Sequence, residues 1–227
     1  GLAVGKWRCG AAATASDGAG APPLQRRVGW GGRVIGRATK AGGLLTMFAM
    51  RLHAPGTPLR WENVPDPTPG PGEIRVKVLA CGVCRTDLHV VDGELPHPTV
   101  PIVPGHQIIG RIDRLGAGVT SLSVGQRVGI PWLGHTCGHC PYCTSQHENL
   151  CDHPQFTGYT RDGGYATLAV ADARFTFPLG EKGDDVALAP LLCAGLIGWR
   201  ALGKAQDAQR IGLYGFGSAA HILIPVL

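Results

Sequence analysis

Nine consecutive residues combine two thiols, a cation, a hydroxyl, a carboxylate and an imidazole, in the stretch Cys81-Gly-Val-Cys-Arg-Thr-Asp-Leu-His89. Each of these polar groups would need a partner if it were buried, so a purely structural segment seldom carries all of them. A thiolate ligand of zinc, with neighbours that orient ligands and move protons, accounts for the mixture. A redox dithiol formed by the Cys-x-x-Cys pair, or half of a structural metal site, accounts for the thiols as well.

A second group of cysteines has the spacing of a closed zinc site. Its members, which we call the four-cysteine cluster, are Cys137, Cys140, Cys143 and Cys151. Four thiolates can surround Zn²⁺ tetrahedrally at about 2.3 Å each and leave no position for water, so this site would hold a loop in shape and catalyse nothing. Three nearby histidines, which we rank below the sulfurs as ligands, are His135, His139 and His147.

An open metal site would have to draw its ligands from distant parts of the chain. Besides Cys84, the candidates are His106, in Pro104-Gly-His-Gln107, and Cys193, just before Ala194 and Gly195. Sequence spacing does not establish that these three side chains meet, and an isolated His or Cys is more often an ordinary core or surface residue. Cys81 is best interpreted as a small residue packed beside the site.

The charge distribution argues against nucleic-acid binding. The net charge is +5, but residues 1–46 hold seven basic residues and one acid, which leaves 14 basic and 15 acidic residues in 47–227. The body of the chain is therefore close to neutral and has no basic face for a phosphate backbone. We expect no nucleic-acid partner.

The cysteines and the apolar runs indicate where such a protein works. Eight cysteines could form four disulfides in a secreted protein, but half of them crowd into 137–151 at spacings that suit one metal. We therefore favour a reducing, cytoplasmic compartment, where thiols stay free for zinc. No apolar run approaches the roughly 20 residues that a membrane span needs, so we expect no membrane partner.

Residues 1–46 are rich in Gly, Ala and Arg and show no helical or strand period. A transit peptide would also be Ser-rich and amphipathic, and a signal peptide would have an apolar core of about 7–15 residues. We interpret 1–46 as a disordered extension ahead of a natural start near Met47. Cys9, isolated within it, is assigned no role.

From Met47 onward the sequence predicts a compact, bent antiparallel β domain. Short apolar runs broken by Gly and Pro recur, and the run at 74–79 alternates with period two. A stiff turn segment rich in proline, 65–72, precedes the first of them. The further strands are expected at 108–112, 127–130 and 165–170.

The pattern changes near Asp184. Asp184 and Asp185 supply helix-capping acids, an apolar stretch follows as far as Leu202, and Gly203 with Lys204 is typical of a helix end. Residues 210–214 then predict a buried strand that runs directly into Gly215-Phe-Gly-Ser-Ala-Ala220. A strand followed by G-x-G-x-x-A is the opening of a dinucleotide-binding βαβ unit.

Taken in chain order, these motifs resemble the zinc-dependent medium-chain alcohol dehydrogenase family. The matching strings are C-G-V-C-R-T-D-L-H, V-P-G-H, C-x-x-C-x-x-C-x(7)-C, A-P-L-L-C-A-G and G-F-G-S-A-A, and together they cover about residues 47–224. The resemblance implies a fold that is mainly β with an α/β part. A GroES-like zinc-binding catalytic domain would span 47–178, and 179–227 would hold a linking helix and the start of a truncated Rossmann domain.

The resemblance also implies two zinc ions per chain. Cys84, His106 and Cys193 would bind a catalytic zinc, and the four-cysteine cluster would bind a structural zinc. The catalytic metal would act as a Lewis acid on the alcohol oxygen while a nicotinamide accepts the hydride.

Further roles follow from the same resemblance. Thr86 would take the alcohol proton and His89 would pass it to solvent, since an imidazole exchanges protons near neutral pH. Asp87 would hydrogen-bond His106 and fix its tautomer. The remaining residues would serve the cofactor pyrophosphate (Arg85, Gly215, Gly217 and Ala220) and the wall of the substrate pocket (Trp132).

The chain departs from the family pattern at three positions. Gln107 stands where the family commonly has Glu, which removes a negative charge beside the metal and any role of that charge in ligand exchange. Ala220 replaces the third glycine of the fingerprint, a change that this motif tolerates. Pro225 falls where the phosphate-binding helix should continue, and an interior proline costs about 3 kcal/mol.

The resemblance therefore implies a dehydrogenase that interconverts small primary or secondary alcohols with aldehydes or ketones, using NAD or NADP, with NAD favoured. Related zinc dehydrogenases of polyols or aromatic alcohols remain open. A dinucleotide domain has about six strands and this sequence offers one, so we expect the chain alone to be an inactive or incomplete fragment of a homo-oligomeric parent. The alternative is a non-catalytic, zinc-stapled β domain that serves as a folding or interaction module.

Overall fold

The computed structural model describes residues 46–96, 98–205 and 208–227. The expectations for 1–45, including the extension and Cys9, lie outside the described residues. The first strand, β1 (Thr46–Arg51), begins one residue before the expected start at Met47 and pairs antiparallel with β2 (Arg60–Pro65). A second short pair joins β6 (Leu133–His135) to β7 (Gln155–Phe156).

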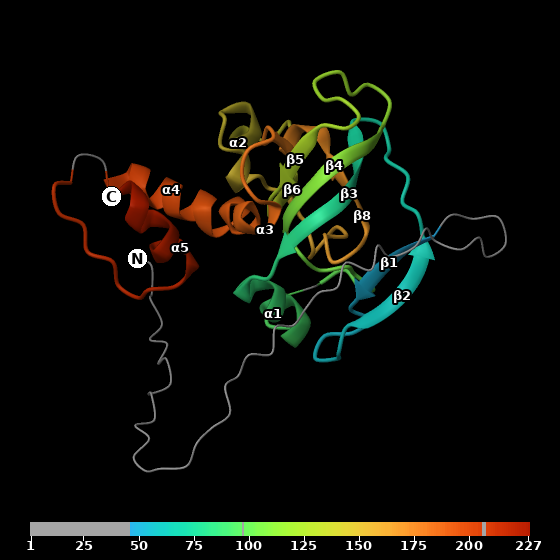
Figure 1. The fold of residues 1–227 in the computed structure, drawn as a ribbon, viewed down its shortest axis with the longest axis horizontal. Helices are drawn as coiled ribbons and strands as arrows, with labels where there is room; N and C mark the ends of the chain where they lie inside the picture. The colour runs from blue at the N-terminus through green and yellow to red at the C-terminus, as the bar shows by residue number, and fades with distance from the viewer. Residues whose placement is uncertain (1–45, 97, 206–207) are drawn as a thin grey trace, which may run out of the picture. The chain divides into compact units, whose positions relative to one another are not determined.

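A five-stranded antiparallel sheet forms the centre of the described chain (Figure 1). Its strand order is β8-β3-β4-β5-β9. In chain order the strands are β3 (Glu73–Gly82), β4 (Gln107–Leu115), β5 (Arg127–Ile130), β8 (Leu168–Asp172) and β9 (Phe177–Pro178). The strands predicted at 74–79, 108–112 and 127–130 are confirmed within β3, β4 and β5.

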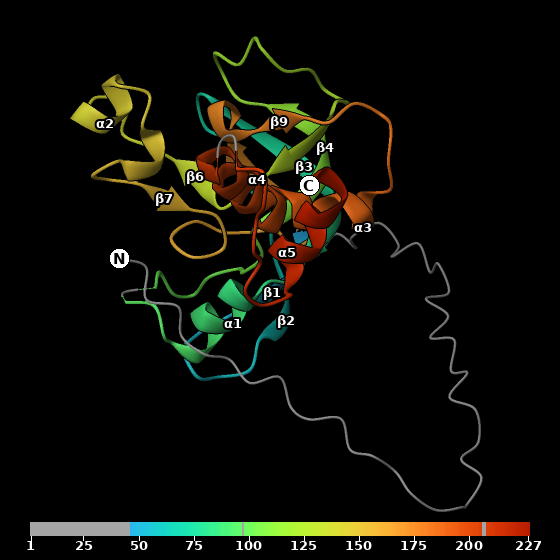
Figure 2. The same ribbon diagram turned by 90° about the vertical axis from the view of Figure 1, so that its left-hand side faces the viewer.

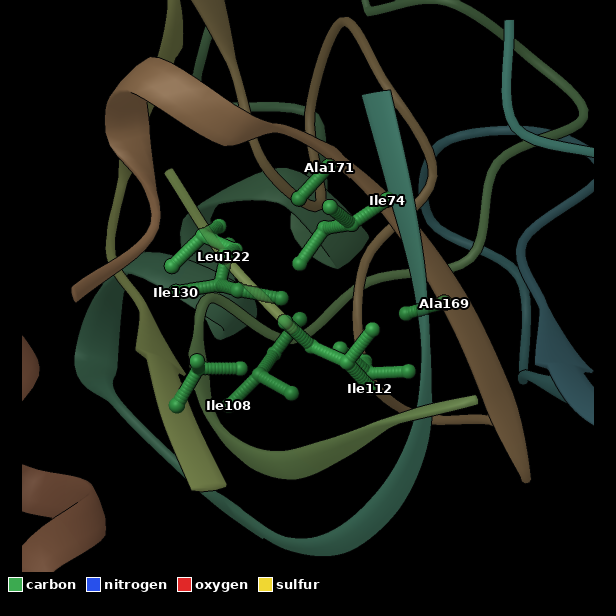
Figure 3. Close-up of a cluster of buried hydrophobic side chains, with 9 residues drawn as sticks. Ile74, Ile108, Ile112, Leu122, Ile130, Ala169 and Ala171 are labelled. Atoms are coloured by element: carbon green, nitrogen blue, oxygen red, sulfur yellow. The ribbon is translucent and has the colours of Figure 1, made fainter. Parts of the chain in front are cut away.

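Alternating apolar side chains of these strands build the main core (Figure 3). Ile74 and Val76 of β3 point into it with no exposed surface, and Ile108 and Ile112 of β4 lie beside them, almost fully buried. Period-two spacing puts these residues on one face of the sheet. Between them, Arg75 is also buried, because its guanidinium forms two hydrogen bonds of 2.9 Å with the Asp113 carboxylate.

The strand predicted at 165–170 begins later than expected, at Leu168. Tyr165 uses its backbone elsewhere: its N–H donates to the carbonyl of Pro104 at 3.0 Å and its carbonyl accepts from Met50 at 2.8 Å. A backbone committed to these two partners cannot also pair with β3. Residues 163–165 therefore bind the loop that precedes β4 instead of extending the sheet.

The helices are short and lie at the ends of strands and in connections. The α-helices are α1 (Arg85–Asp92), α2 (Pro141–Thr144), α3 (Asp185–Leu188), α4 (Ala194–Ala205) and α5 (Ser218–Leu223). The 3₁₀ turns are η1 (Glu148–Leu150), η2 (Ala173–Phe175), η3 (Ala189–Leu192) and η4 (Ile224–Val226). Figure 2 shows α2 and the β6–β7 pair in one lobe beside the sheet.

The helical stretch near the C-terminus differs from its prediction in two places. Asp184 caps α3 as expected, accepting from the backbone of Val186 and Ala187 at 3.0 Å. The helix is broken at Cys193, whose backbone leaves the helical region (φ −131°, ψ −75°). The predicted helix end at Gly203 and Lys204 is wrong by a short distance, since α4 continues through both to Ala205.

The buried strand predicted at 210–214 is wrong. These residues form no strand and are exposed, with Tyr214 exposed to 96%. A strand needs a neighbour to accept its backbone hydrogen bonds, and no strand of the described residues pairs with this segment. Helix α5 nevertheless forms after it, and Pro225 lies in η4, where the helix has ended.

No single helix of the described part is long and apolar enough to cross a membrane. The bent pair formed by 185–192 and α4, with a 50° angle between its halves, reaches the required length and composition only when both halves are counted together.

The loop before β4 is held in place by close backbone contacts at Gly105. Gly105 has φ +96°, and a Cβ atom there would lie 2.6 Å from the Tyr165 ring and 2.8 Å from Cys81 Sγ. Only glycine fits both the backbone angle and the space. The loop carries His106 at its end, so its fit sets where that side chain lies.

We expect Gly105→Ala to lower the free energy of unfolding by about 1–3 kcal/mol more than Gly118→Ala, because forced overpacking typically has that magnitude. Gly118 is a matched control: it has φ +82°, but nothing lies within 4 Å of the place that an alanine methyl group would take, so it reports backbone strain alone. Urea unfolding of both variants measures the difference. Equal losses in the two variants would contradict a steric role for the Tyr165 contact.

Candidate functional site

Three potential metal ligands from distant parts of the chain converge at the ends of three elements. Cys84 precedes α1, His106 precedes β4, and Cys193 lies at the break between η3 and α4. One donor atom from each lies within 4.8 Å of the other two, and the sulfurs of Cys84 and Cys193 are 3.8 Å apart. The structure thus brings together the three residues whose meeting could not be derived from their spacing.

The sheet positions Cys193 through the turn before it. Leu192 and Ala189 of η3 pack against Ile109 of β4. Arg127 of β5, almost fully buried, donates to the Asp185 carboxylate at 2.8 Å and to the carbonyls of the loop before α3. These contacts fix the turn against the sheet, so Cys193 is held on the side of His106.

His106 has one ring nitrogen without a hydrogen-bond partner. Its Nδ1 bonds Asp87 Oδ1 at 2.9 Å, whereas its Nε2 is buried and unpaired. An unsatisfied buried nitrogen is unfavourable by about 1–3 kcal/mol unless something binds it. The sulfurs of Cys84 and Cys193 lie within 4.8 Å of the His106 donor atom. Two sulfurs and an imidazole nitrogen are a donor set that suits Zn²⁺, so the residues fit a metal ion at this position.

The three side chains also influence one another's protonation. A hydrogen bond from the Cys193 thiol lowers the pKa of Cys84 to about 3, and the resulting thiolate raises the pKa of Cys193 well above its ordinary value. Burial opposes a charge on His106, but Asp87 and the Cys84 thiolate outweigh it and raise the pKa of His106 to about 9. A divalent cation would therefore displace protons here, and its binding would strengthen as pH rises.

Asp87 is almost completely buried and makes the contact expected of it. Its carboxylate accepts from His106 and also from the Cys84 backbone N–H at 2.7 Å, which caps the start of α1. A third donor is the hydroxyl of Tyr165, at 2.9 Å. The apolar pattern predicted only a strand at Tyr165, and no spacing rule pointed to its contact with Asp87.

The other polar residues of the stretch 81–89 lie at different positions on α1. The Thr86 hydroxyl lies 3.7 Å from Cys84 Sγ, and Thr86 lines the cavity that contains His106 and Cys193. His89 is three residues further on the same helical face and pairs with Glu94, a partner that the sequence did not indicate. His89 is not among the residues that line this cavity. Arg85 is exposed at the first position of α1.

A cavity of about 1110 Å³ opens beside His106 and Cys193. Trp132 forms part of its wall and meets the His106 ring edge-on, with 5.1 Å between centroids. Behind it, Trp132 stacks on Phe156 and Tyr159 at 5.0 and 5.8 Å. Stacked aromatic rings therefore back the wall next to His106, and further out the wall is mainly apolar, where Leu196 and Ile197 of α4 contribute.

The four-cysteine cluster is also assembled. Its four sulfurs lie within 4.8 Å of one another, with Cys140 and Cys151 buried. Backbone N–H groups point at the sulfurs, such as that of Cys137 to Cys151 at 3.4 Å and that of Cys140 to Cys137 at 3.4 Å. The N–H of Asp152 lowers the pKa of Cys140 to about 6. Burial raises the pKa of Cys143 to about 11, so within the cluster it is Cys140 whose thiolate, the form that binds zinc, is favoured.

The three histidines near the four-cysteine cluster form hydrogen bonds with other groups. His139 Nδ1 bonds the carbonyl of Cys137 at 3.0 Å, and His147 Nδ1 bonds the carbonyl of Ser145 at 2.7 Å. His135 Nδ1 bonds the Asp172 carboxylate at 2.7 Å. None of the three belongs to the donor group that the described residues form at the cluster.

The residues of the G-x-G-x-x-A motif, 215–220, lie around the start of α5. Gly215 has φ +89°, Gly217 precedes the first residue of the helix, and Ala220 lies within it, half-buried. Helix α5 packs on α4 at Gly198, where an added Cβ atom would lie 3.1 Å from the Leu223 side chain. The glycine-rich turn and the helix of the motif are therefore formed, while the strand before them is not.

Comparison with known proteins agrees with this architecture. Residues 70–181 match the alcohol dehydrogenase GroES-like domain. Over 192 residues the chain is 44% identical to a protein of Mycobacterium tuberculosis described as "Probable alcohol dehydrogenase", a match that covers 80% of this chain and 56% of the relative. The chain spans about half the length of the curated relatives it matches.

Two solved structures have a similar fold. One is a cobalt- and zinc-bound thermostable alcohol dehydrogenase from Pyrobaculum aerophilum, with a TM-score of 0.71, 27% identity, and coverage of 78% of this chain and 54% of that chain. The other is acetophenone reductase from Geotrichum candidum in complex with NAD, with a TM-score of 0.68, 30% identity, and coverage of 78% and 55%.

The chain belongs to the zinc-type medium-chain alcohol dehydrogenase family. Its described part is a GroES-like antiparallel β domain followed by the start of a Rossmann domain, which confirms the fold class expected from the motifs.

Asp172 ties the four-cysteine lobe to the sheet. At the end of β8, its carboxylate accepts from His135 of β6 and from Arg174, and Arg174 in turn donates to the carbonyl of Thr136 at 3.2 Å. Burial would raise the pKa of Asp172, but the hydrogen bonds from Arg174 and His135 outweigh it and hold the pKa below its usual value.

We expect Asp172→Asn to lower the free energy of unfolding at pH 7 by about 1.5–3 kcal/mol, the usual contribution of hydrogen bonds to a charged group. Because the folded pKa lies below the unfolded one, this stability is fully present above the unfolded pKa, near 4, and is lost as pH falls through the folded pKa. Denaturant unfolding between pH 3 and 7 measures it, with Asp92→Asn at an exposed position as the control. A loss that stayed the same across this range would contradict the role of the Asp172 charge.

Proposed function

We propose that this chain provides the metal-binding catalytic part of a zinc-dependent dehydrogenase that interconverts small primary or secondary alcohols with aldehydes or ketones, using NAD or NADP. One observation carries the proposal: His106 has a buried, unpaired Nε2, and its ligand atom and the sulfurs of Cys84 and Cys193 all lie within 4.8 Å of one another. Two cysteines and one histidine are the ligand set of catalytic zinc in alcohol dehydrogenases, and three protein ligands leave a position for substrate oxygen.

At this site Cys84, His106 and Cys193 would hold the metal, which when bound would supply Lewis-acid polarisation of the substrate oxygen. The Asp87 carboxylate would keep the proton of His106 on Nδ1, so that Nε2 stays free as a ligand. Trp132, held by its stack on Phe156 and Tyr159, would restrict the width of the substrate beside the ligands.

Proton transfer would run along α1. The Thr86 hydroxyl both donates and accepts, and its place at the cavity wall next to Cys84 supports its role as the first acceptor of the alcohol proton. His89, on the same helical face outside the cavity, would pass the proton toward solvent. Its pairing with Glu94 would stabilise the protonated imidazole in that step.

The four-cysteine cluster would hold a second, structural zinc, for a total of two per chain. Arg85 and the turn of Gly215, Gly217 and Ala220 would bind the cofactor pyrophosphate, with NAD favoured, as in the NAD complex of the related reductase. We further propose a reducing, cytoplasmic compartment, no nucleic-acid or membrane partner, and a homo-oligomeric full-length protein.

We expect the purified chain to hold two zinc ions and Cys193→Ala to hold one, because two ligands alone bind zinc weakly. Metal content by plasma mass spectrometry measures both. Cys81→Ala is the matched control, since Cys81 lies three residues from Cys84 and packs against the apolar core. One zinc in the wild-type chain, unaffected by Cys193→Ala, would overturn the catalytic assignment and favour a zinc-stapled folding or interaction module.

Turnover is a separate question. We expect the 227-residue chain alone to show no meaningful reduction of NAD⁺ or NADP⁺ with a panel of short alcohols, since 208–217 do not form the strand that a dinucleotide-binding unit uses. Absorbance at 340 nm follows the reaction. Clear activity would contradict this expectation and would at the same time support the chemistry proposed for the site.

A further inference from the structure

The Asp87 carboxylate links three separate parts of the chain. Oδ1 bonds His106 Nδ1 at 2.9 Å, while Oδ2 accepts the Cys84 backbone N–H at 2.7 Å and the Tyr165 hydroxyl at 2.9 Å. Asp87 is 3% exposed, so these donors replace the water that its carboxylate would otherwise bind. The orientation of the carboxylate therefore depends on the donors that hold Oδ2.

Tyr165 is well placed to hold that oxygen. Its backbone is fixed on both sides, by its N–H to Pro104 and by its carbonyl to Met50. Its ring lies against Gly105, where a Cβ atom would come within 2.6 Å of it. The ring thus touches the residue before His106, and the hydroxyl touches the carboxylate that bonds His106.

The second acceptor available to the hydroxyl is a poorer one. The Gly82 carbonyl lies 3.5 Å from the Tyr165 oxygen, at the limit of a hydrogen bond, whereas Asp87 is 2.9 Å away and charged. The hydroxyl therefore donates chiefly to Asp87. Removing it would leave Oδ2 with the Cys84 N–H alone and would weaken the restraint on the orientation of the carboxylate.

We propose that Tyr165 is a positioning residue of the metal centre, whose hydroxyl holds Asp87 in the orientation that keeps His106 Nε2 aimed at the point shared by Cys84 and Cys193. This inference rests on the proposed metal site but concerns a residue that belongs neither to the donor group nor to the lining of the cavity. Tyr165, Asp87 and His106 form a hydrogen-bonded chain with the free nitrogen at its end.

The test replaces the zinc of the 227-residue chain with Co²⁺ and compares Tyr165→Phe with the wild type. Phenylalanine keeps the ring on Gly105, so the fold should survive while only the hydroxyl is lost. We expect the Co²⁺ dissociation constant of the Cys84–His106–Cys193 site to rise about 10-fold, the lower end for loss of a group that orients a ligand. We also expect the visible d–d bands of that site to shift.

Two comparisons separate positioning from general stability. The four-cysteine cluster of the same molecule is an internal control, and its Co²⁺ affinity should not change. Thr167→Val is the matched variant: it removes a hydroxyl two residues away that accepts from the Phe48 N–H at 3.2 Å, with no contact to Asp87. Thermal unfolding of both variants reports any loss of stability.

The outcomes distinguish the two proposals. Suppose that the wild-type chain binds two Co²⁺ ions and that Tyr165→Phe shows the same Co²⁺ affinity and the same d–d bands. That result would overturn the role of Tyr165 and leave the proposed function standing. Equal affinity losses in Tyr165→Phe and Thr167→Val would also overturn it, because a general loss of stability would then explain both. A wild-type chain that binds Co²⁺ only at the four-cysteine cluster would overturn the proposed function and the inference together.

Discussion

The hydrogen bond between Asp87 and His106 is the interaction on which the site depends. Both side chains are almost fully buried, and neither would be stable there alone, because a buried carboxylate or imidazolium loses its hydration. Asp87 gains three donors and His106 gains an acceptor for Nδ1. The pair is stable because each partner satisfies the other, and its geometry leaves Nε2 as the one ring nitrogen available to a ligand.

The same carboxylate couples secondary structure to the site. Asp87 caps α1 through the Cys84 N–H, so the start of the helix and the position of the Cys84 sulfur are set by one group. The second sulfur belongs to Cys193, which lies at the break between η3 and α4. A continuous helix would turn that sulfur along the helix face, whereas the non-helical residue at the break lets it approach Cys84 to 3.8 Å.

The two cysteine sites are held by different means. The Cys84–His106–Cys193 site is built on the ends of β4, α1 and η3, so the sheet and its core support it. The lobe of the four-cysteine cluster consists of very short elements, among them α2 with four residues and η1 with three. Such elements are not stable alone, and the lobe is joined to the sheet through Asp172 and Arg174. Cross-linking by a metal is the natural way to stabilise a lobe with so little core.

Local sequence determined the features that depend on neighbouring residues. A period-two run located β3, and short apolar runs located β4 and β5. Asp184 marked the start of α3, and the close spacing of Cys137 to Cys151 indicated a metal-binding cluster. Each of these features depends on residues that are neighbours along the chain. Only the tertiary structure decided what depends on distant contacts. The meeting of Cys84 and Cys193, 109 positions apart, the contact of Tyr165 with Asp87, and the late start of β8 follow from packing across the sheet. The strand expected at 210–214 failed for the same reason: a strand is defined by its neighbour, and its own residues carry no information about whether one is present.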